Sequence, residues 1–201
     1  LNGEGFRVVA VAYKIIKTPK AAYTVADETG LTLLGTIAFL DPPKDSVAAA
    51  IASLNRAGVA VKILTGDNDV ITRTICRQVG LPVERIVLGA EVAAMGDAAL
   101  EDAAEQATVF AKVSPEQKAR VIDALQRRGH VVGFMGDGIN DGPALKAADV
   151  GVSVDTAVDI AKESADIILL EKSLAVLEDG VMEGRKIFAN ITKYIRMGAS
   201  S

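Results

Sequence analysis

The sequence has few or none of the residue types that redox and zinc sites require. Among its 201 residues there is no tryptophan, one histidine (His130) and one cysteine (Cys76). These counts exclude an intrachain disulfide, a CxxC redox pair and a zinc site with the usual number of His and Cys ligands. A single cysteine also fits a reducing, cytosolic compartment.

Long apolar runs and a surplus of positive charge are also lacking. No stretch approaches the roughly 18 consecutive apolar residues of a transmembrane helix, and the N-terminus does not resemble a signal peptide. The 22 basic and 26 acidic residues are interspersed and give a net charge of −4. This balance argues against a nucleic-acid partner. The chain does not begin with Met, which indicates that it is a piece of a longer protein.

Small aliphatic side chains are abundant. Half of the residues are hydrophobic but only 4% are aromatic, a mixture typical of Val/Ile strands packed between Ala-rich helices. From Leu31 onward, short apolar runs alternate with helical patterns of about ten to fifteen residues, which predicts a Rossmann-like α/β domain with a parallel sheet flanked by helices. The expected strands are 31–40, 59–64, 85–88, 109–111, 131–135, 150–152 and 167–170, and the expected helices are 44–56, 69–79, 97–106, 115–128 and 143–147. Before this domain we expect a strand over 6–16 and a linker over 17–30.

The first candidate site follows the expected strand 59–64, where Thr65-Gly66-Asp67 comes next. In parallel sheets, ligands bind beyond the carboxyl ends of the strands, and backbone N–H groups there hold anions. A hydroxyl followed by glycine could therefore hold a phosphate. The alternative is a simple helix start with Asp or Asn as the N-cap.

The second candidate site is the glycine-rich segment 133–145. It places Asp137, Asn140 and Asp141 within five positions, directly after an apolar strand. Oxygen ligands on such a loop suit a hard cation such as Mg²⁺. The alternative is that Asn140 or Asp141 caps the helix that begins near Pro143, with the glycines forming turns.

The third candidate is Lys118, one turn into the helix that Ser114-Pro115-Glu116-Gln117 begins. A lysine in this place could extend over the edge of the sheet toward a phosphate. An ordinary surface lysine would fit the same pattern.

Together, Thr65-Gly66-Asp67, Lys118 and the segment 136–141 resemble the last three motifs of the haloacid-dehalogenase-like phosphotransferases, in the form found in P-type ATPases. Asp41-Pro-Pro-Lys resembles the hinge between the nucleotide-binding and phosphorylation domains of these pumps. The segment 5–10 resembles the closing strand of the nucleotide-binding domain. The resemblance covers nearly the whole chain and implies a haloacid-dehalogenase-type fold.

The resemblance also implies a chemistry and a role for each site residue. In P-type ATPases, an aspartate in an Asp-Lys-Thr-Gly-Thr motif accepts the γ-phosphoryl group of ATP, and hydrolysis of the aspartyl-phosphate drives cation transport. That motif is absent from this chain, so the chain alone is expected to be inactive. The implied catalytic residues are Thr65, Gly66, Asp67, Lys118, Asn140 and Asp141. Asp137 and Asp141 are the implied Mg²⁺ ligands, and Arg7, Asp41, Thr65, Gly66, Asp67 and Lys118 are the implied ATP contacts.

The last part of the chain predicts a long amphipathic helix. Apolar or small residues recur at Val181, Gly184, Phe188, Ile191 and Ile195. The charges along it change from acidic to basic, which fits a helix that ends near a membrane surface and equally fits a complement to the helix macrodipole. By resemblance this is the stalk that leads into a transmembrane helix. Segments 171–174 and 183–195 are similar to the magnesium-transporting P-type ATPases.

These resemblances imply four regions. They are a strand of the nucleotide-binding domain (1–16), a hinge with a returning strand (17–40), the second half of the phosphorylation domain (41–176) and a stalk helix (177–201). The implied partners are the nucleotide-binding, actuator and transmembrane domains of the same protein and the transported cation. The whole would be a cytoplasmic part of an integral cell-membrane protein. The alternatives are a pump for another cation such as calcium, a soluble phosphatase of the same fold, or a binding module that keeps Mg²⁺ and phosphate affinity without turnover.

Overall fold

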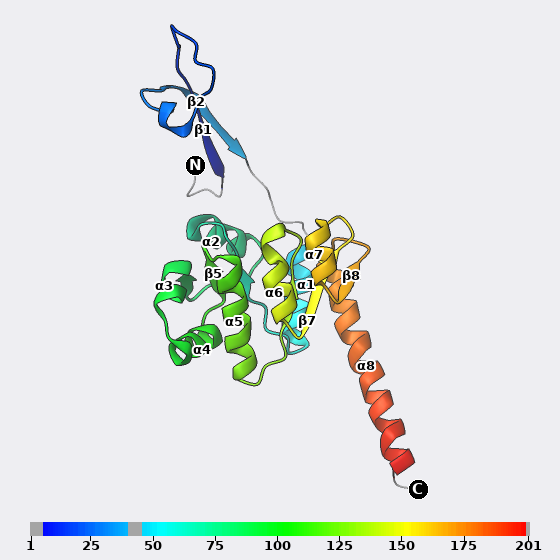
Figure 1. Cartoon of the computed structure of the whole chain (residues 1–201). Helices are drawn as coiled ribbons and strands as arrows, with labels where there is room; N and C mark the ends of the chain where they lie inside the picture. Colours follow the sequence, from blue (N-terminus) through cyan, green and yellow to red (C-terminus); the bar gives the residue numbers. More distant parts are fainter. Residues whose placement is uncertain (1–5, 40–45, 200–201) are drawn as a thin grey trace.

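The computed structural model describes residues 6–39 and 46–199, with Arg7 included as backbone. The first elements are β1 (Arg7–Tyr13), η2 (Val25–Asp27), β2 (Thr32–Phe39), α1 (Ser46–Arg56), β3 (Ile63–Leu64), α2 (Asp69–Gln78), β4 (Ile86–Leu88), α3 (Gly89–Ala94) and α4 (Asp97–Gln106). They are followed by β5 (Val109–Ala111), α5 (Pro115–Arg127), β6 (Gly133–Met135), η3 (Ile139–Asp141), α6 (Gly142–Ala147), β7 (Val150–Val154), α7 (Asp159–Ser164), β8 (Ile167–Leu169) and α8 (Leu174–Ala199). Figure 1 shows these elements along the chain.

The strands β1 and β2 form an antiparallel hairpin. Arg7 lies opposite Phe39 and Tyr13 lies opposite Thr32, with a register shift between Val11 and Ala12. The expectation that 31–40 begins the parallel sheet is therefore wrong, because this strand pairs with β1 instead. The expected linker 17–30 lies in the connection of the hairpin and includes the short 3-10 helix η2.

The rest of the described chain is an α/β body with parallel strands, as the sequence predicts. The strands form two sheets of three, ordered β3-β5-β4 and β6-β7-β8. We expected one parallel sheet; among the described residues no strand ladder joins β3 to β6, so each of these strands lies at an edge. The two sheets are instead connected by α5, which follows β5, precedes β6 and packs against α6 (Figure 1).

The central strand β5 shows how side-chain alternation builds two cores. Phe110 faces a cluster that includes Val87, Leu100 and Val121 from β4, α4 and α5. Its neighbours in the strand, Val109 and Ala111, face the opposite cluster, which includes residues of α1 and α2. All three strand residues are fully buried. Successive side chains of a strand point to opposite faces, so three residues of β5 hold helices on both sides of the sheet.

The helix α8 packs on the body at its beginning and extends from it toward its end (Figure 1). Its first part lies against α1, where Ser53 donates a hydrogen bond to Glu178 and Arg185 donates to the carbonyl of Ala57. Farther along, Phe188 and Ile195 are 72% and 65% exposed. No helix among the described residues is both long and apolar enough to cross a membrane.

The sequence predicted most element boundaries closely but missed two short helices. α3 and α7 have six residues each, too few for an apolar periodicity to be visible. The strand predicted over 59–64 is restricted to Ile63–Leu64, and α8 begins at Leu174.

Candidate functional site

Two loops and one helix start bring the predicted site residues to the carboxyl ends of the strands. One loop follows β3 and carries Thr65, the other follows β6 and carries Asp137 and Asp141. The helix start is that of α5, with Lys118 in its first turn.

The Thr65 turn is closed by its own hydrogen bonds. The backbone N–H of Asp67 donates to Oγ1 of Thr65 (3.1 Å), and the carbonyl of Asp67 accepts from the N–H of Lys112 (2.9 Å). The following helix α2 is capped by Asn68, whose Oδ1 accepts from the N–H of Ile71 (2.9 Å). The alternative of a capped helix start is thus correct for Asn68. Because Asn68 caps α2 and Thr65 Oγ1 only accepts a bond from Asp67, the Thr65 hydroxyl can still donate a hydrogen bond to a ligand.

The start of α5 is a capping box, as the sequence predicts. Ser114 Oγ accepts from the N–H of Gln117 (3.3 Å), and Gln117 Oε1 accepts from the N–H of Ser114 (2.9 Å). The pKa of Glu116 lies below its usual value, mainly because its own backbone N–H donates to the carboxylate and also because Ser114 donates to it. The carbonyl of Thr65 accepts from the N–H of Val113 (3.1 Å), so the Thr65 turn is tied directly to this helix start.

The centre of the site is an ion pair between Lys118 and Asp141. Lys118 Nζ lies 2.7 Å from Asp141 Oδ1, and the two side chains are only 10% and 14% exposed. The second carboxylate oxygen of Asp141 accepts from the N–H groups of Asp137 (3.2 Å) and Gly138 (3.0 Å). The carboxylate thus fixes the loop after β6 and holds the lysine beside it. The alternative of an ordinary surface lysine is wrong, because Lys118 is buried.

Gly136 permits the close approach of Asp141. A Cβ atom at position 136 would lie 2.5 Å from Cβ and 2.8 Å from Cγ of Asp141, distances that non-bonded carbon atoms do not adopt. The N-cap position of α6 is Asp141, but its side chain makes no capping bond to that helix. The alternative that the Asp141 side chain caps the helix near Pro143 is therefore wrong.

Ser153 forms a hydrogen bond with this loop from the neighbouring strand β7, and the sequence did not identify it as a site residue. It is fully buried in β7, and its Oγ donates to the carbonyl of Gly136 (2.8 Å). The N–H of Gly136 in turn donates to the carbonyl of Val152 (3.1 Å). The available signal was a polar residue within the otherwise apolar run 150–154.

Asp137 presents its carboxylate toward solvent and toward a second lysine. Its side chain is 48% exposed, and Oδ2 forms an ion pair with Lys172, which lies between β8 and α8. Lys172 was not identified as a site residue from the sequence, since 35 positions separate it from Asp137 and its segment, 171–174, was noted only for its family resemblance.

The remaining predicted residues are not brought into this cluster. Asn140 is exposed on η3, and Gly66 is exposed in the Thr65 turn. No hydrogen bond or ion pair between described residues joins Thr65 itself to Lys118. The backbone of Arg7 begins β1 in the hairpin, and Asp41 lies outside the described residues.

The carboxylates offer a partial fit to Mg²⁺. The described residues contain no cluster of three or more His, Cys, Asp or Glu side chains that could enclose a metal. Mg²⁺ often binds through only one or two carboxylates, with water and substrate phosphates completing its shell. Asp137 suits this role because its carboxylate is half exposed, whereas the oxygens of Asp141 already accept bonds from Lys118 and two backbone N–H groups.

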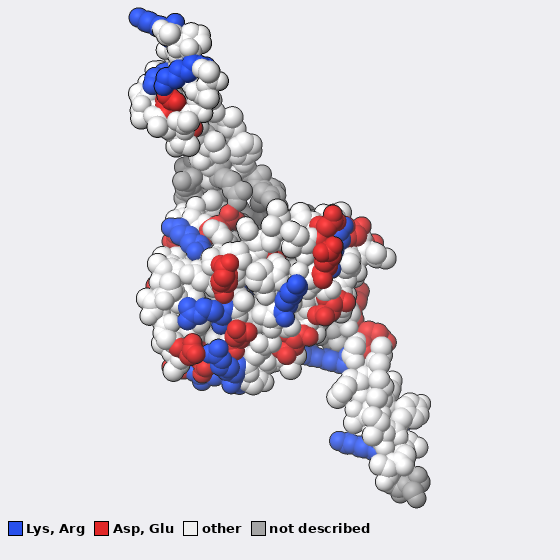
Figure 2. Space-filling model, in the orientation of Figure 1, with Lys and Arg blue, Asp and Glu red and all other residues white. Residues whose placement is uncertain are grey.

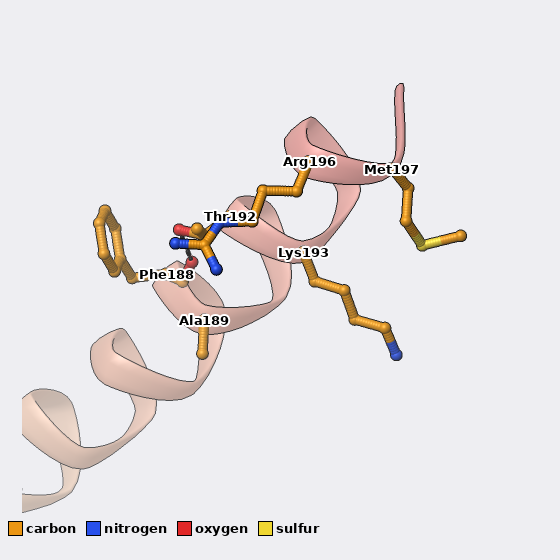
Figure 3. Close-up of a pocket in the computed structure, with 6 residues that line it drawn as sticks. All are labelled: Phe188, Ala189, Thr192, Lys193, Arg196 and Met197. Carbon is orange, nitrogen blue, oxygen red and sulfur yellow. Dashed lines mark hydrogen bonds between the residues drawn. The ribbon is translucent and has the colours of Figure 1, made fainter. Parts of the chain in front are cut away.

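The charges over the body do not form a single large patch in the view of Figure 2, where acidic and basic side chains alternate. A shallow hollow is lined by Phe188, Ala189, Thr192, Lys193, Arg196 and Met197. Figure 3 shows that all six residues come from the outer part of α8. This hollow is the face of one exposed helix and contains none of the predicted site residues.

Comparisons with known proteins show which family the chain resembles. The family model of the haloacid dehalogenase-like hydrolases matches residues 8–149. The whole chain is 55% identical to a magnesium-transporting ATPase, P-type 1, of Escherichia coli, of which it covers 22%. It is 39% identical over 96% of its length to the cation-transporting ATPase pma1 of Synechocystis, and 37% identical over its whole length to calcium-transporting ATPase 1 of Yarrowia lipolytica. The chain spans 22% of the length of each of these relatives.

Proposed function

Because the chain belongs to the haloacid dehalogenase-like hydrolase family, we propose that it forms the second half of the phosphorylation domain of a magnesium-transporting P-type ATPase. The observation that carries this proposal is the buried Lys118–Asp141 pair, placed where the loops after β3, β5 and β6 meet. The relatives that match over the whole chain are named as P-type or cation-transporting ATPases, which supports it.

Phosphoryl transfer needs positive charge and hydrogen-bond donors around the equatorial oxygens of the phosphate. In this proposal the Lys118 ammonium and the Thr65 hydroxyl supply them. Asp141 keeps Lys118 oriented, since it holds the ammonium at 2.7 Å and is itself fixed by two backbone N–H groups. Asp137 would hold Mg²⁺, and Asp141 would join it through the lone pair that its three present hydrogen bonds leave available. When bound, Mg²⁺ would neutralise charge on the phosphoryl oxygens. Asn140 is proposed to orient the phosphate beside them.

The aspartate that accepts the phosphoryl group would lie outside this chain. The topology supports a place for its strand between β3 and β6, because both are edge strands and their following loops carry the proposed phosphate and metal residues. A parallel strand added there would join the two sheets and end between Thr65 and Asp137. The chain by itself is therefore expected to form no phosphoenzyme.

The remaining regions follow the same proposal. Residues 1–16 and 17–40 would belong to the nucleotide-binding domain and the hinge, with Arg7, Asp41 and Asp67 near the nucleotide ATP. Residues 41–176 would form the phosphorylation domain, and 177–201 the stalk toward the transmembrane domain. The actuator domain would complete the pump, and this chain would lie on the cytoplasmic side of the cell membrane.

A pump for another cation is the second candidate. The calcium-transporting relative of Yarrowia lipolytica favours it, but at 37% identity against 55% for the magnesium-transporting one. Magnesium is therefore the proposed cargo.

The test uses the intact protein in a bacterial strain that lacks its own magnesium uptake systems. We expect the wild-type protein to restore growth in low-magnesium medium and Asp141→Asn to fail at equal membrane abundance. Asp159→Asn is the matched control, because this aspartate has a 91% exposed side chain on α7 and should leave growth intact. Growth restored by Asp141→Asn would contradict the proposed site. Transport of calcium instead of magnesium by the wild type would contradict the proposed cargo.

A further inference from the structure

The ion pair between Asp137 and Lys172 connects the proposed metal site to the start of α8. Oδ2 of Asp137 contacts Nζ of Lys172, and the two side chains are 48% and 57% exposed. Lys172 lies after β8 and two positions before Leu174, the first residue of α8. The contact therefore joins the loop after β6 to the root of the longest helix.

The backbone of Asp137 is fixed while its carboxylate faces solvent. Its N–H donates to Oδ2 of Asp141 (3.2 Å), and its carbonyl accepts from the N–H of Val158 (3.3 Å). These bonds hold the main chain on both sides of the Asp137 Cα atom. The carboxylate can therefore exchange one cationic partner for another without a change in the loop.

The segment that carries Lys172 is a tight turn. The N–H of Ser173 donates to the carbonyl of Glu171 (2.8 Å), and Ser173 Oγ accepts from the N–H of Ala175 (3.3 Å) in the first turn of α8. The carbonyl of Ser173 accepts from the N–H of Leu177 (3.4 Å). Ser173, the residue that follows Lys172, is thus hydrogen-bonded to the first turn of α8.

We propose that Lys172 is a positioning residue that holds the Asp137 carboxylate in the absence of Mg²⁺ and is displaced when Mg²⁺ binds there. Mg²⁺ binding then breaks the link between the loop after β6 and the start of α8. This inference rests on the proposed function, in which Asp137 is a ligand of Mg²⁺. It adds that the Lys172 ammonium competes with Mg²⁺ for the Asp137 carboxylate, and that this contact connects the metal site to the start of α8.

The first measurement is a Mg²⁺ titration of the 201-residue chain by calorimetry. Removal of the competing ammonium by Lys172→Met should tighten Mg²⁺ binding about 1.5- to 5-fold, the range expected for an exposed ion pair. Lys172→Arg keeps a cation and should bind Mg²⁺ as the wild type does. The control for the loss of one positive charge is Lys186→Met, because Lys186 is exposed on α8 and pairs with Glu183 at 3.0 Å.

The second measurement distinguishes displacement from a general effect of charge. The chain contains no tryptophan, so Leu170→Trp places a single tryptophan, which can be excited selectively, beside the turn at a position that is 82% exposed. In the Leu170→Trp chain that keeps Lys172, we expect Mg²⁺ to shift the emission of the tryptophan. In the Lys172→Met background the emission should already resemble the Mg²⁺-bound value and should not respond.

Four results would overturn the inference, and they separate its failure from that of the proposed function. Equal Mg²⁺ affinities for Lys172→Met and Lys186→Met, or the same emission response with and without Lys172, would exclude displacement while leaving Asp137 as a ligand. Mg²⁺ binding that is unchanged by Asp137→Asn would overturn both this inference and the proposed role of Asp137 as a ligand. Absence of Mg²⁺ binding from the wild-type chain would overturn this inference alone, because in the proposed function the phosphorylated aspartate and the substrate phosphates complete the metal shell.

Discussion

Lys118 Nζ lies 2.7 Å from Oδ1 of Asp141 and thereby joins the first turn of α5 to the loop that follows β6. Both side chains are largely excluded from solvent, so each charge is stabilised mainly by the other. The carboxylate is also stabilised by the backbone N–H groups of Asp137 and Gly138. A pair in this position sets the orientation of a cation that would otherwise be flexible, and it closes one side of the proposed phosphate site.

The pair should show strong coupling between its two members. We expect Lys118→Met to lower the free energy of unfolding by about 1–3 kcal/mol, since it removes the charged partner of a largely buried carboxylate. In a cycle with Asp141→Asn, the coupling energy should be about 0.5–3 kcal/mol. Urea denaturation of the four chains measures both quantities.

Lys112→Met is the control for this cycle. Lys112 also pairs with an aspartate, Asp69 at 3.6 Å, but the two side chains are 55% and 40% exposed. Its removal should change stability by no more than about 0.5 kcal/mol. Additive effects of Lys118→Met and Asp141→Asn would show that the two residues do not act as a pair.

Gly136→Ala should destabilise the chain and displace Asp141. The added Cβ atom would lie 2.5 Å from Cβ of Asp141, and the loop is held by hydrogen bonds that resist a shift. We expect a loss of about 1–3 kcal/mol in the free energy of unfolding. In the strand that precedes this loop, β6, Gly133→Ala brings its Cβ no nearer than 3.8 Å, to the carbonyl oxygen of Val150, and should stay within about 1 kcal/mol of the wild type. Equal stabilities of the two variants would refute the steric argument.

How far the sequence predicted the fold and the site depends on the range of the contacts. The capping box of Ser114 and Gln117 was predictable because all its atoms lie within one helical turn. The motifs also indicated Lys118 and Asp141 as site residues. They did not indicate that the two residues form an ion pair, because a motif shows which residues belong to a site but not which of them are in contact.

The missed features are those that depend on tertiary packing. The pairing of β2 with β1 could not be distinguished from pairing in the parallel sheet, because apolar alternation marks a strand and not its partner. Turn formation was the only structural alternative considered for the glycines of 133–145, whereas Gly136 leaves room for Asp141. Ser153 and Lys172 approach the loop after β6 from positions outside the three motifs that indicated the site.

Ser153→Ala should weaken the loop after β6 without touching any proposed ligand. It leaves the carbonyl of Gly136 without the donor that the buried Ser153 hydroxyl supplies, and it should cost about 1–3 kcal/mol of unfolding free energy. Hydrogen exchange of the Gly138 amide should also become faster. Thr74→Ala removes a hydroxyl that bonds to the carbonyl of Val70 within α2, and it should leave stability unchanged or slightly higher. Unaltered exchange at Gly138 in Ser153→Ala would contradict the supporting role of the serine.

Acidification should remove the contribution that the Asp149 carboxylate makes to the free energy of unfolding. Its pKa is lowered, mainly because the N–H of Val132 donates to its carboxylate at 2.8 Å and also because Gln126 donates to it. A lowered folded-state pKa means that the carboxylate stabilises the fold above its unfolded pKa, near 3.8, and loses this effect as the pH falls through the folded value. Asp149→Asn should therefore be less stable than the wild type at neutral pH, and the difference should close in acid.

Denaturation curves recorded from neutral pH down to about pH 3 measure this difference. Asp179→Asn, which removes an acidic residue exposed on α8, controls for the change in net charge. A stability gap between Asp149→Asn and the wild type that stays constant with pH would contradict the assignment.

The most direct test of the central claim is ³²P incorporation from [γ-³²P]ATP into the intact protein in membranes, comparing the wild type with Asp137→Asn and Lys118→Met. We predict an acid-stable, hydroxylamine-sensitive phosphoenzyme in the wild type, strongly reduced in both variants, and none in the 201-residue chain alone. Absence of a phosphoenzyme from the wild type, or its undiminished formation in both variants, would contradict the assignment of these loops to phosphoryl transfer.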